Sequence, residues 1–117
     1  MEKGPAFERV AAQAGTVDTS EDWPTFRHDA KRSGGVTRTL PTALKVAWKT
    51  RIGGRLTAPV CAEGVVLTAS IDAGQVVALD AGSGKQRWRF IAGGRIDSPP
   101  SVLGSLVLFG CADGYVY

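Results

Sequence analysis

Residues 48–55 read WKTRIGGR, and residues 88–95 read WRFIAGGR, an offset of 40 residues (88 − 48). The same offset relates further proline, glycine and valine positions: Pro59 and Pro99, Gly64 and Gly104, Gly74 and Gly114, and Val76 and Val116. A repeat of about 40 residues that is built from short strands is typical of a β-propeller blade. The sequence therefore predicts consecutive propeller blades.

The apolar pattern between the repeated positions predicts short antiparallel strands joined by tight turns. In the first repeat the expected strands are 55–62, 65–69, 75–79 and 85–90. The second repeat restarts with the expected strands 96–103, 106–109 and 115–117. One further half-buried strand is expected at residues 45–49, which alternate polar and apolar side chains. The predicted fold class is all-β, with antiparallel four-stranded propeller blades in an incomplete set of about two.

The chain divides into three predicted parts. These are a flexible leader (1–21), an extended segment ahead of the first blade (22–43) and a partial β-propeller (44–117), the last made of one repeat (48–87) and a truncated repeat (88–117). Trp23 and Phe26, on either side of Pro24, are expected to anchor the extended segment to a surface. Because closed propellers have at least about four blades, we expect a fragment of a longer chain.

The composition excludes several functional classes. The 117 residues are 44% hydrophobic, which suits a packed core, and the net charge of +3 is spread along the chain. Since no basic patch stands out, we expect no nucleic-acid partner. No stretch approaches the roughly 18 apolar residues of a membrane span, and the first residues lack the apolar run of a signal peptide. Cys61 and Cys111 have no metal-ligand spacing and are interpreted as two buried thiols.

Three stretches resemble the quinoprotein-like repeat, also called the PQQ-like repeat. They read VALDAGSGKQRW at 77–88, DGYVY at 113–117 and DWPTFRHD at 22–29. The first two are similar to the blade pattern of that family, and the third is similar to the segment before the first blade in bacterial members. The resemblance implies a β-propeller and a periplasmic or cell-envelope location. The activity stays open, because the family includes dehydrogenases that hold pyrroloquinoline quinone (PQQ) and calcium as well as non-enzymatic relatives, such as the lipoprotein of the outer-membrane β-barrel assembly machinery.

The residues present favour the non-enzymatic group. Dehydrogenases that resemble this chain usually carry adjacent cysteines, a cofactor-stacking tryptophan, and a calcium-binding glutamate and asparagine. Here Cys61 and Cys111 stand apart, and asparagine is absent. The predicted function is a non-enzymatic β-propeller scaffold or protein-binding module with a protein partner and no cofactor. The alternative is a fragment of a PQQ-dependent quinoprotein dehydrogenase, in which PQQ and calcium would bind only to the full-length enzyme.

Four positions are predicted to dock one blade onto the next: Trp48, Trp88, Gly74 and Gly114. Burial of an indole ring contributes a few kcal/mol. In propellers that resemble this chain, the first strand often completes the last blade. The strand around Trp48 would then pair with a strand outside this chain, and open strand edges of this kind are expected to permit self-association.

Arg55 and Arg95 form the one predicted binding feature. Each follows a Gly-Gly pair at the same point of the repeat, so successive blades would place one guanidinium each at the same mouth of the ring. Arginine suits bidentate recognition of carboxylate and phosphate, so the hypothesis is a cationic rim for an acidic peptide or another anion. The alternative is internal pairing, with Asp97 close enough in sequence to neutralise Arg95. No catalytic, cofactor-binding or metal-binding residue is predicted, and the single histidine, His28, is interpreted as solvated or hydrogen-bonded.

Overall fold

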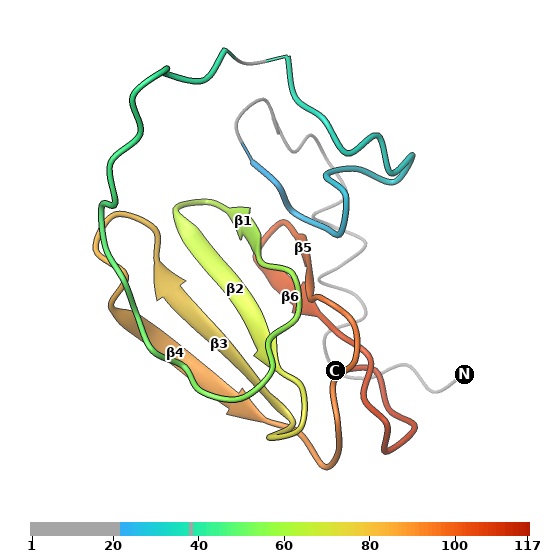
Figure 1. Ribbon diagram of the computed structural model, residues 1–117. Coiled ribbons are helices and arrows are strands. Elements are labelled where there is room, and N and C mark those ends of the chain that lie inside the picture. The colour runs from blue at the N-terminus through green and yellow to red at the C-terminus, as the bar shows by residue number, and fades with distance from the viewer. Residues whose placement is uncertain (1–21, 38) are drawn as a thin grey trace.

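The computed structural model describes residues 22–37 and 39–117. Within these residues every regular element is a β-strand, and six strands form two antiparallel sheets. The predicted all-β fold of incomplete propeller blades is therefore confirmed (Figure 1). The predicted flexible leader, residues 1–21, lies outside the described residues.

The first sheet is a four-stranded blade whose strands are paired in chain order. They are β1 (Val60–Ala62), β2 (Val65–Ser70), β3 (Gln75–Asp80) and β4 (Gln86–Ile91). β2 and β3 lie in the middle and are mostly buried, which explains their apolar runs, whereas all of β4 is exposed. Within this sheet β1 is much shorter than its predicted range, 55–62, and Leu56 pairs with Ser70 in a separate bridge. The four strands predicted for the first repeat are thus confirmed.

The second sheet repeats the first in part. β5 (Ser101–Leu103) and β6 (Leu106–Leu108) form an antiparallel hairpin. Beyond β6, Gly110 and Val116 form a bridge, and the backbone groups of Phe109 and Tyr117 exchange hydrogen bonds of 3.0 and 2.9 Å. The strand predicted at 115–117 is therefore reduced to a short pairing beside this hairpin.

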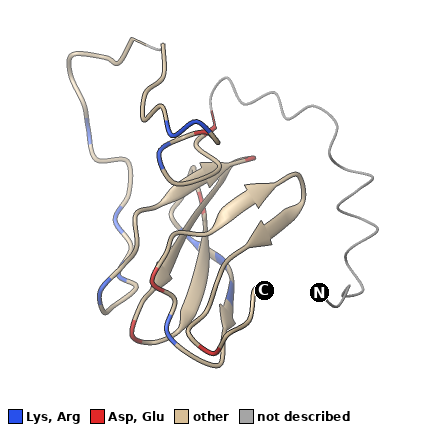
Figure 2. Cartoon of the chain, turned by 90° about the vertical axis from the view of Figure 1, so that its right-hand side faces the viewer, with Lys and Arg blue, Asp and Glu red and all other residues tan. Residues whose placement is uncertain are grey.

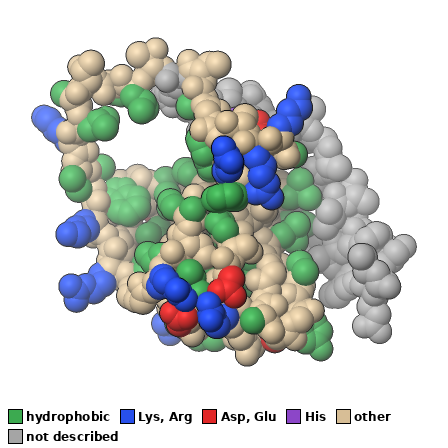
Figure 3. Space-filling view, turned by 45° about the vertical axis from the view of Figure 1, so that its right-hand side comes forward, with side chains coloured by type: hydrophobic (Ala, Val, Ile, Leu, Met, Phe, Trp, Pro, Cys, Tyr) green, Lys and Arg blue, Asp and Glu red, His purple; other side chains and the backbone are tan. Residues whose placement is uncertain are grey.

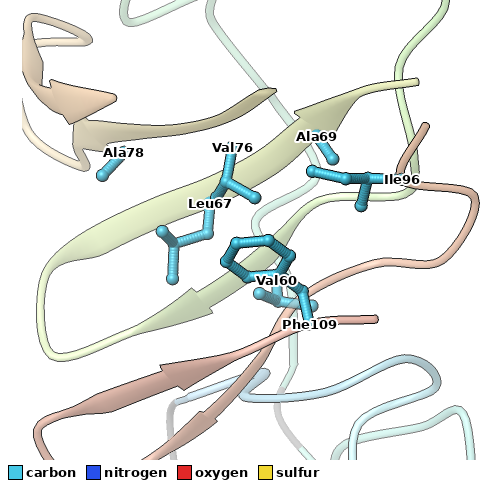
Figure 4. Packing of buried hydrophobic residues seen from close by; sticks show 7 residues of the cluster. All are labelled: Val60, Leu67, Ala69, Val76, Ala78, Ile96 and Phe109. Atoms are coloured by element: carbon cyan, nitrogen blue, oxygen red, sulfur yellow. The ribbon is translucent and has the colours of Figure 1, made fainter. Parts of the chain in front are cut away.

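One buried cluster joins the two repeats (Figure 4). Its members are Val60, Leu67, Ala69, Val76 and Ala78 from the first sheet, with Ile96 and Phe109 from the second repeat. Ile96 is completely buried, and Phe109 is 7% exposed. Because burial of a large apolar side chain contributes about 1.5–3 kcal/mol, these two residues hold the second repeat against one face of the first sheet.

The segment around Trp23 connects the first strands of both sheets. Trp23 exchanges backbone hydrogen bonds of 2.6 and 2.9 Å with Cys61 in β1, and the Pro24 carbonyl accepts a 2.7 Å bond from Val102 in β5. Pro24 suits this position because its fixed φ favours extended backbone and it needs no hydrogen-bond acceptor. The segment thus links β1 of the first sheet to β5 of the second sheet through backbone hydrogen bonds.

The extended conformation predicted for residues 22–43 ends soon after Pro24. A turn follows in which Arg27 and His28 adopt left-handed backbone, with φ values of 61° and 79°. Phe26 is 43% exposed, and the Arg32 guanidinium lies 5.6 Å from its ring centre. Phe26 therefore packs against a neighbouring cation on the surface, and the backbone groups of Trp23 and Pro24 hold this segment to the blades.

The prediction of a strand at residues 45–49 is wrong. These residues lie in the long loop that leads into β1 (Figures 1 and 2). Val46 is 85% exposed. A strand is stabilised by ladder hydrogen bonds, and no backbone group in the described part of the chain bonds to this segment. Its attachment comes from two side chains, those of Trp48 and Thr50.

Candidate functional site

An apolar groove lies between β4 and the second sheet. It has a volume of about 450 Å³ and is lined by Trp88, Arg89, Phe90, Val107, Phe109 and Tyr117. Trp88, Phe90 and Tyr117 are 39%, 42% and 37% exposed. Exposed apolar groups gathered at one place mark interaction surfaces, so this groove is the main candidate site.

Strand alternation builds the groove. In β4, Trp88 and Phe90 are two residues apart and therefore project from the same face. Opposite them, the rings of Phe109 and Tyr117 stack with centres 5.5 Å apart, and the Phe90 ring lies 5.8 and 5.4 Å from these two. Aromatic pairs at such separations contribute about 0.5–1.5 kcal/mol beyond their burial. Rings from both repeats thus form one cluster.

Tyr117 is oriented by Asp113. The Tyr117 hydroxyl donates a 2.7 Å hydrogen bond to the Asp113 carboxylate, which also accepts a 3.0 Å bond from the Tyr115 N–H. The bond from Tyr117 is the main cause that lowers the pKa of Asp113, and the same bond raises the pKa of Tyr117. Asp113 therefore has a structural role in its turn.

Trp48 lies against the turn between β3 and β4. Its indole Nε1–H donates a 2.8 Å bond to the Ala81 carbonyl, and the Thr50 hydroxyl donates a 2.6 Å bond to the Gly84 carbonyl. The ring covers Gly84 so closely that a Cβ atom at this position would overlap it. Gly84 was not among the predicted docking residues, although it stands in the blade pattern at 77–88 and has a left-handed φ of 69°.

The other predicted docking residues have different surroundings. Trp48 covers Gly84, which follows it by 36 residues (84 − 48). Trp88 faces the groove instead. Gly74 lies in close contact with the Gly94 carbonyl, whereas the space around Gly114 is open. The blade-docking role of these four residues stays a prediction.

Replacement of Gly84 by alanine is expected to release the Trp48 indole. The added methyl group would overlap the ring, and left-handed backbone costs a residue with a Cβ atom about 1–2 kcal/mol. We expect the Trp48 Nε1 proton to exchange with water about tenfold faster, as measured by NMR. Gly82→Ala is the matched control, because its Cβ would meet only an ordinary contact of 3.5 Å. An unchanged exchange rate of the Trp48 Nε1 proton in Gly84→Ala would contradict the packing of the indole ring on Gly84.

Arg55 and Arg95 approach the same carboxylate. The distances are 3.3 Å from Arg55 and 3.8 Å from Arg95 to Asp72, and Arg95 also pairs with Asp97 at 2.6 Å. Figure 3 shows basic and acidic side chains alternating in one group on the face in view. Exposed pairs of this kind contribute little to stability. The two arginines are thus close together, and their function as an anion-binding rim stays a prediction.

Asp80 holds the turn between β3 and β4. Its carboxylate accepts bonds of 2.9 and 2.8 Å from the Ser83 N–H and hydroxyl, and a 2.6 Å bond from Arg87. These bonds, with that from Arg87 as the largest cause, lower the pKa of Asp80 from 3.8 to about 2. Because the folded-state pKa is the lower one, the bonds stabilise the fold above about pH 4, and this contribution is lost as the pH falls toward 2.

Substitution of Arg87 by glutamine is expected to raise the pKa of Asp80 toward 3.8. The rise should be partial, because the Ser83 bonds remain, and acid unfolding should begin at a higher pH. NMR titration of the Asp80 carboxyl carbon measures the change. Arg89→Gln removes the same charge two residues further along β4 and should leave the pKa unchanged. A pKa that stays near 2 in Arg87→Gln would show that Arg87 is not the main partner.

His28 and the two cysteines form no common site in the described ranges. The His28 ring lies 5.1 Å from that of Trp23, and its Nδ1 atom is buried without a hydrogen-bond partner there. This nitrogen lies 3.7 Å from the Asp29 carboxylate, and the His28 side chain as a whole is 18% exposed, so the predicted solvated or hydrogen-bonded histidine stays a prediction. Cys61 and Cys111 are free and only partly buried, and burial is the main cause that raises the pKa of Cys61. Residues 22–37 and 39–117 contain no group of three or more potential metal ligands.

The comparisons with known proteins agree with the fold. No helix among the described residues is long and apolar enough to cross a membrane. A comparison with curated proteins gives no match. The model of the family described as outer membrane protein assembly factor BamB matches residues 31–117, which is 87 residues (117 − 31 + 1) and includes every strand described above. The chain therefore belongs to the BamB family of β-propellers built from PQQ-like repeats.

Proposed function

We propose that this chain is a non-enzymatic β-propeller module that binds protein through the groove between β4 and the second sheet. The observation that carries the proposal is the group of partly exposed aromatic rings at Trp88, Phe90 and Tyr117. Protein interfaces are enriched in aromatic residues and arginine and depleted in acidic residues, and the groove lining has this composition, with Arg89 as its only charged member. The ligand class is an extended peptide segment with apolar side chains.

The acidic side chains support a non-enzymatic role. Asp80 and Asp113 hold turns, and Asp72 and Asp97 pair with arginines. A general base needs a carboxylate that can accept a proton from a substrate, and these four groups already accept bonds from the protein. The family description names an assembly factor, and we extend to this chain only the class of partner that it suggests, another protein.

The competing function is a fragment of a PQQ-dependent dehydrogenase. The described residues do not fit that cofactor. The Trp48 ring packs on Gly84, so this face of the ring is not open for stacking on a quinone. The groove beside Trp88 is lined by no carboxylate or amide side chain. Calcium prefers several oxygen ligands, and no cluster of potential metal ligands lies in the described ranges. We therefore propose that the chain binds neither PQQ nor calcium.

Peptide display against the intact chain tests the proposed function. Enriched peptides should lose at least about tenfold in affinity when Phe90, which lines the groove, is replaced by serine. Tyr115→Ser is the matched control, because Tyr115 is 68% exposed and is not part of the groove lining. Equal peptide affinities of Phe90→Ser and the unsubstituted chain would contradict the proposed site. Saturable quenching of tryptophan fluorescence by PQQ with calcium would favour the dehydrogenase fragment instead.

A further inference from the structure

β4 leaves one edge of the first sheet open. It is the last strand in the order β1-β2-β3-β4, so only β3 pairs with it (Figure 1). The Ala92 N–H donates a 2.8 Å bond to the Gly74 carbonyl, which fixes the β4 residues that bond to β3. Because inward and outward backbone groups alternate along an antiparallel pair, the N–H and C=O groups of Arg89 and Ile91 point away from β3. No other segment in the described ranges forms a backbone hydrogen bond with these two residues, so an added strand can reach them.

The two faces of β4 offer different chemistry at this edge. Trp88 and Phe90 lie opposite Ala78 and Val76 of the buried cluster, so they project from the face that carries the groove. Arg89 projects from the opposite face by strand alternation. Arg89 nevertheless lines the groove together with its two neighbours, so the groove extends to the backbone edge of β4 between them. A strand added at this edge would have one face against the groove and the other face beside Arg89.

Arg89 is a cation whose charge no neighbouring acid balances. The nearby Arg87 pairs with Asp80 at 2.6 Å, whereas the Arg89 side chain forms no ion pair or hydrogen bond with any residue that the structure describes. All six residues of β4 are exposed, so the guanidinium is accessible to a partner. Because a guanidinium recognises carboxylates well, Arg89 favours a partner with an acidic side chain at this point.

We propose that an extended segment of a partner protein adds to β4 as an antiparallel strand, with an acidic side chain opposite Arg89 and an apolar side chain on either side of it. The proposal rests on the proposed function, because it names how the partner occupies the groove. Directly opposed residues share a face and have Cβ atoms about 4.5–5.5 Å apart, so the residue opposite Arg89 meets the guanidinium. Its two neighbours lie on the groove face, beside Trp88 and Phe90. The antiparallel orientation continues that of every strand pair in the two sheets.

A capped peptide that alternates valine with glutamate tests the chemistry of the partner. Its affinity for the intact chain, measured by calorimetry at low salt, should fall about fivefold in Arg89→Glu, because attraction becomes repulsion. The same peptide with glutamine in place of glutamate should lose most of this difference. Lys31→Glu is the matched control, since it makes the same charge change at an exposed position outside β4. Equal affinities of Arg89→Glu and Lys31→Glu for the glutamate peptide would overturn the role of Arg89.

Backbone methylation of the same peptide tests the strand addition in the unsubstituted chain. Methyl groups on the glutamate nitrogens remove the N–H groups that face β4, so the affinity should fall at least about tenfold. Methyl groups on the valine nitrogens face away from β4 and should have little effect. Peptide binding should also slow the amide exchange of Arg89 and Ile91. Equal affinities of the two methylated peptides would overturn the strand addition, and a loss confined to the valine set would overturn its antiparallel orientation.

Phe90→Ser separates this proposal from the proposed function. Phe90 lines the groove, whereas the strand addition depends on the outward backbone groups of Arg89 and Ile91. If Phe90→Ser weakens binding but methylation of the glutamates does not, the groove binds the peptide without an added strand, and the strand addition alone is overturned. If methylation of the glutamates weakens binding but Phe90→Ser does not, the strand addition is supported and the groove is overturned as the binding site.

Discussion

Gly74→Ala is expected to lower the free energy of unfolding by about 2–5 kcal/mol. Gly74 has a left-handed φ of 58°, which costs a residue with a Cβ atom about 1–2 kcal/mol. The new methyl group would also overlap the Gly94 carbonyl oxygen, and overpacking against backbone adds about 1–3 kcal/mol. The Ala92 N–H, which donates a 2.8 Å bond to the Gly74 carbonyl, would be displaced at the same time. Urea denaturation measures the loss.

Gly114→Ala is the matched control, since Gly114 occupies the same point of the second repeat. Its φ of 91° is also left-handed, but nothing lies within 4 Å of a Cβ atom placed there. We expect a loss of only about 1–2 kcal/mol from backbone strain. Equal losses in the two variants would show that the contact between Gly74 and Gly94 does not hold the turn against the second repeat.

Phe109→Ala is expected to lower the free energy of unfolding by about 3–5 kcal/mol. The Phe109 ring is 7% exposed, belongs to the cluster that joins the two repeats, and stacks on Tyr117. Because small domains have about 5–15 kcal/mol of stability in total, this loss should leave a large unfolded fraction in mild denaturant. Thermal or urea unfolding followed by circular dichroism measures it.

Tyr115→Ala is the control for Phe109→Ala. Tyr115 is an aromatic residue of the same repeat, but it is 68% exposed. We expect its replacement to change stability by no more than about 0.5 kcal/mol. If Phe109→Ala cost no more than this control, the two sheets would not share a core through Phe109.

The parts of the fold that depend on local pattern were predictable from the sequence. The apolar run at 65–69 and the alternation at 85–90 became β2 and β4, because strand periodicity and glycine turns act within one hairpin. The repeat offset of 40 residues located the second sheet in the same way. The family resemblance, carried by the blade pattern, is confirmed by the match over residues 31–117.

The features that the sequence did not predict depend on partners far away in the chain. Residues 45–49 have the alternation of a strand but no neighbour in the described ranges, so the pattern alone was insufficient. The contact of Trp48 with Gly84 could have been found by asking which glycine of the blade pattern leaves room for an indole ring. The convergence of two arginines on Asp72 depends on how the turns meet in space.

The two sheets are consecutive blades packed on one core. The most direct test is a nuclear Overhauser measurement between the Phe109 ring and the methyl groups of Val60 and Leu67, which belong to the same buried cluster. We predict strong cross-peaks from the ring to both residues and methyl shifts that reflect a nearby aromatic ring. Absence of these cross-peaks, with Phe109 in rapid contact with water, would contradict the packing of the second repeat on the first.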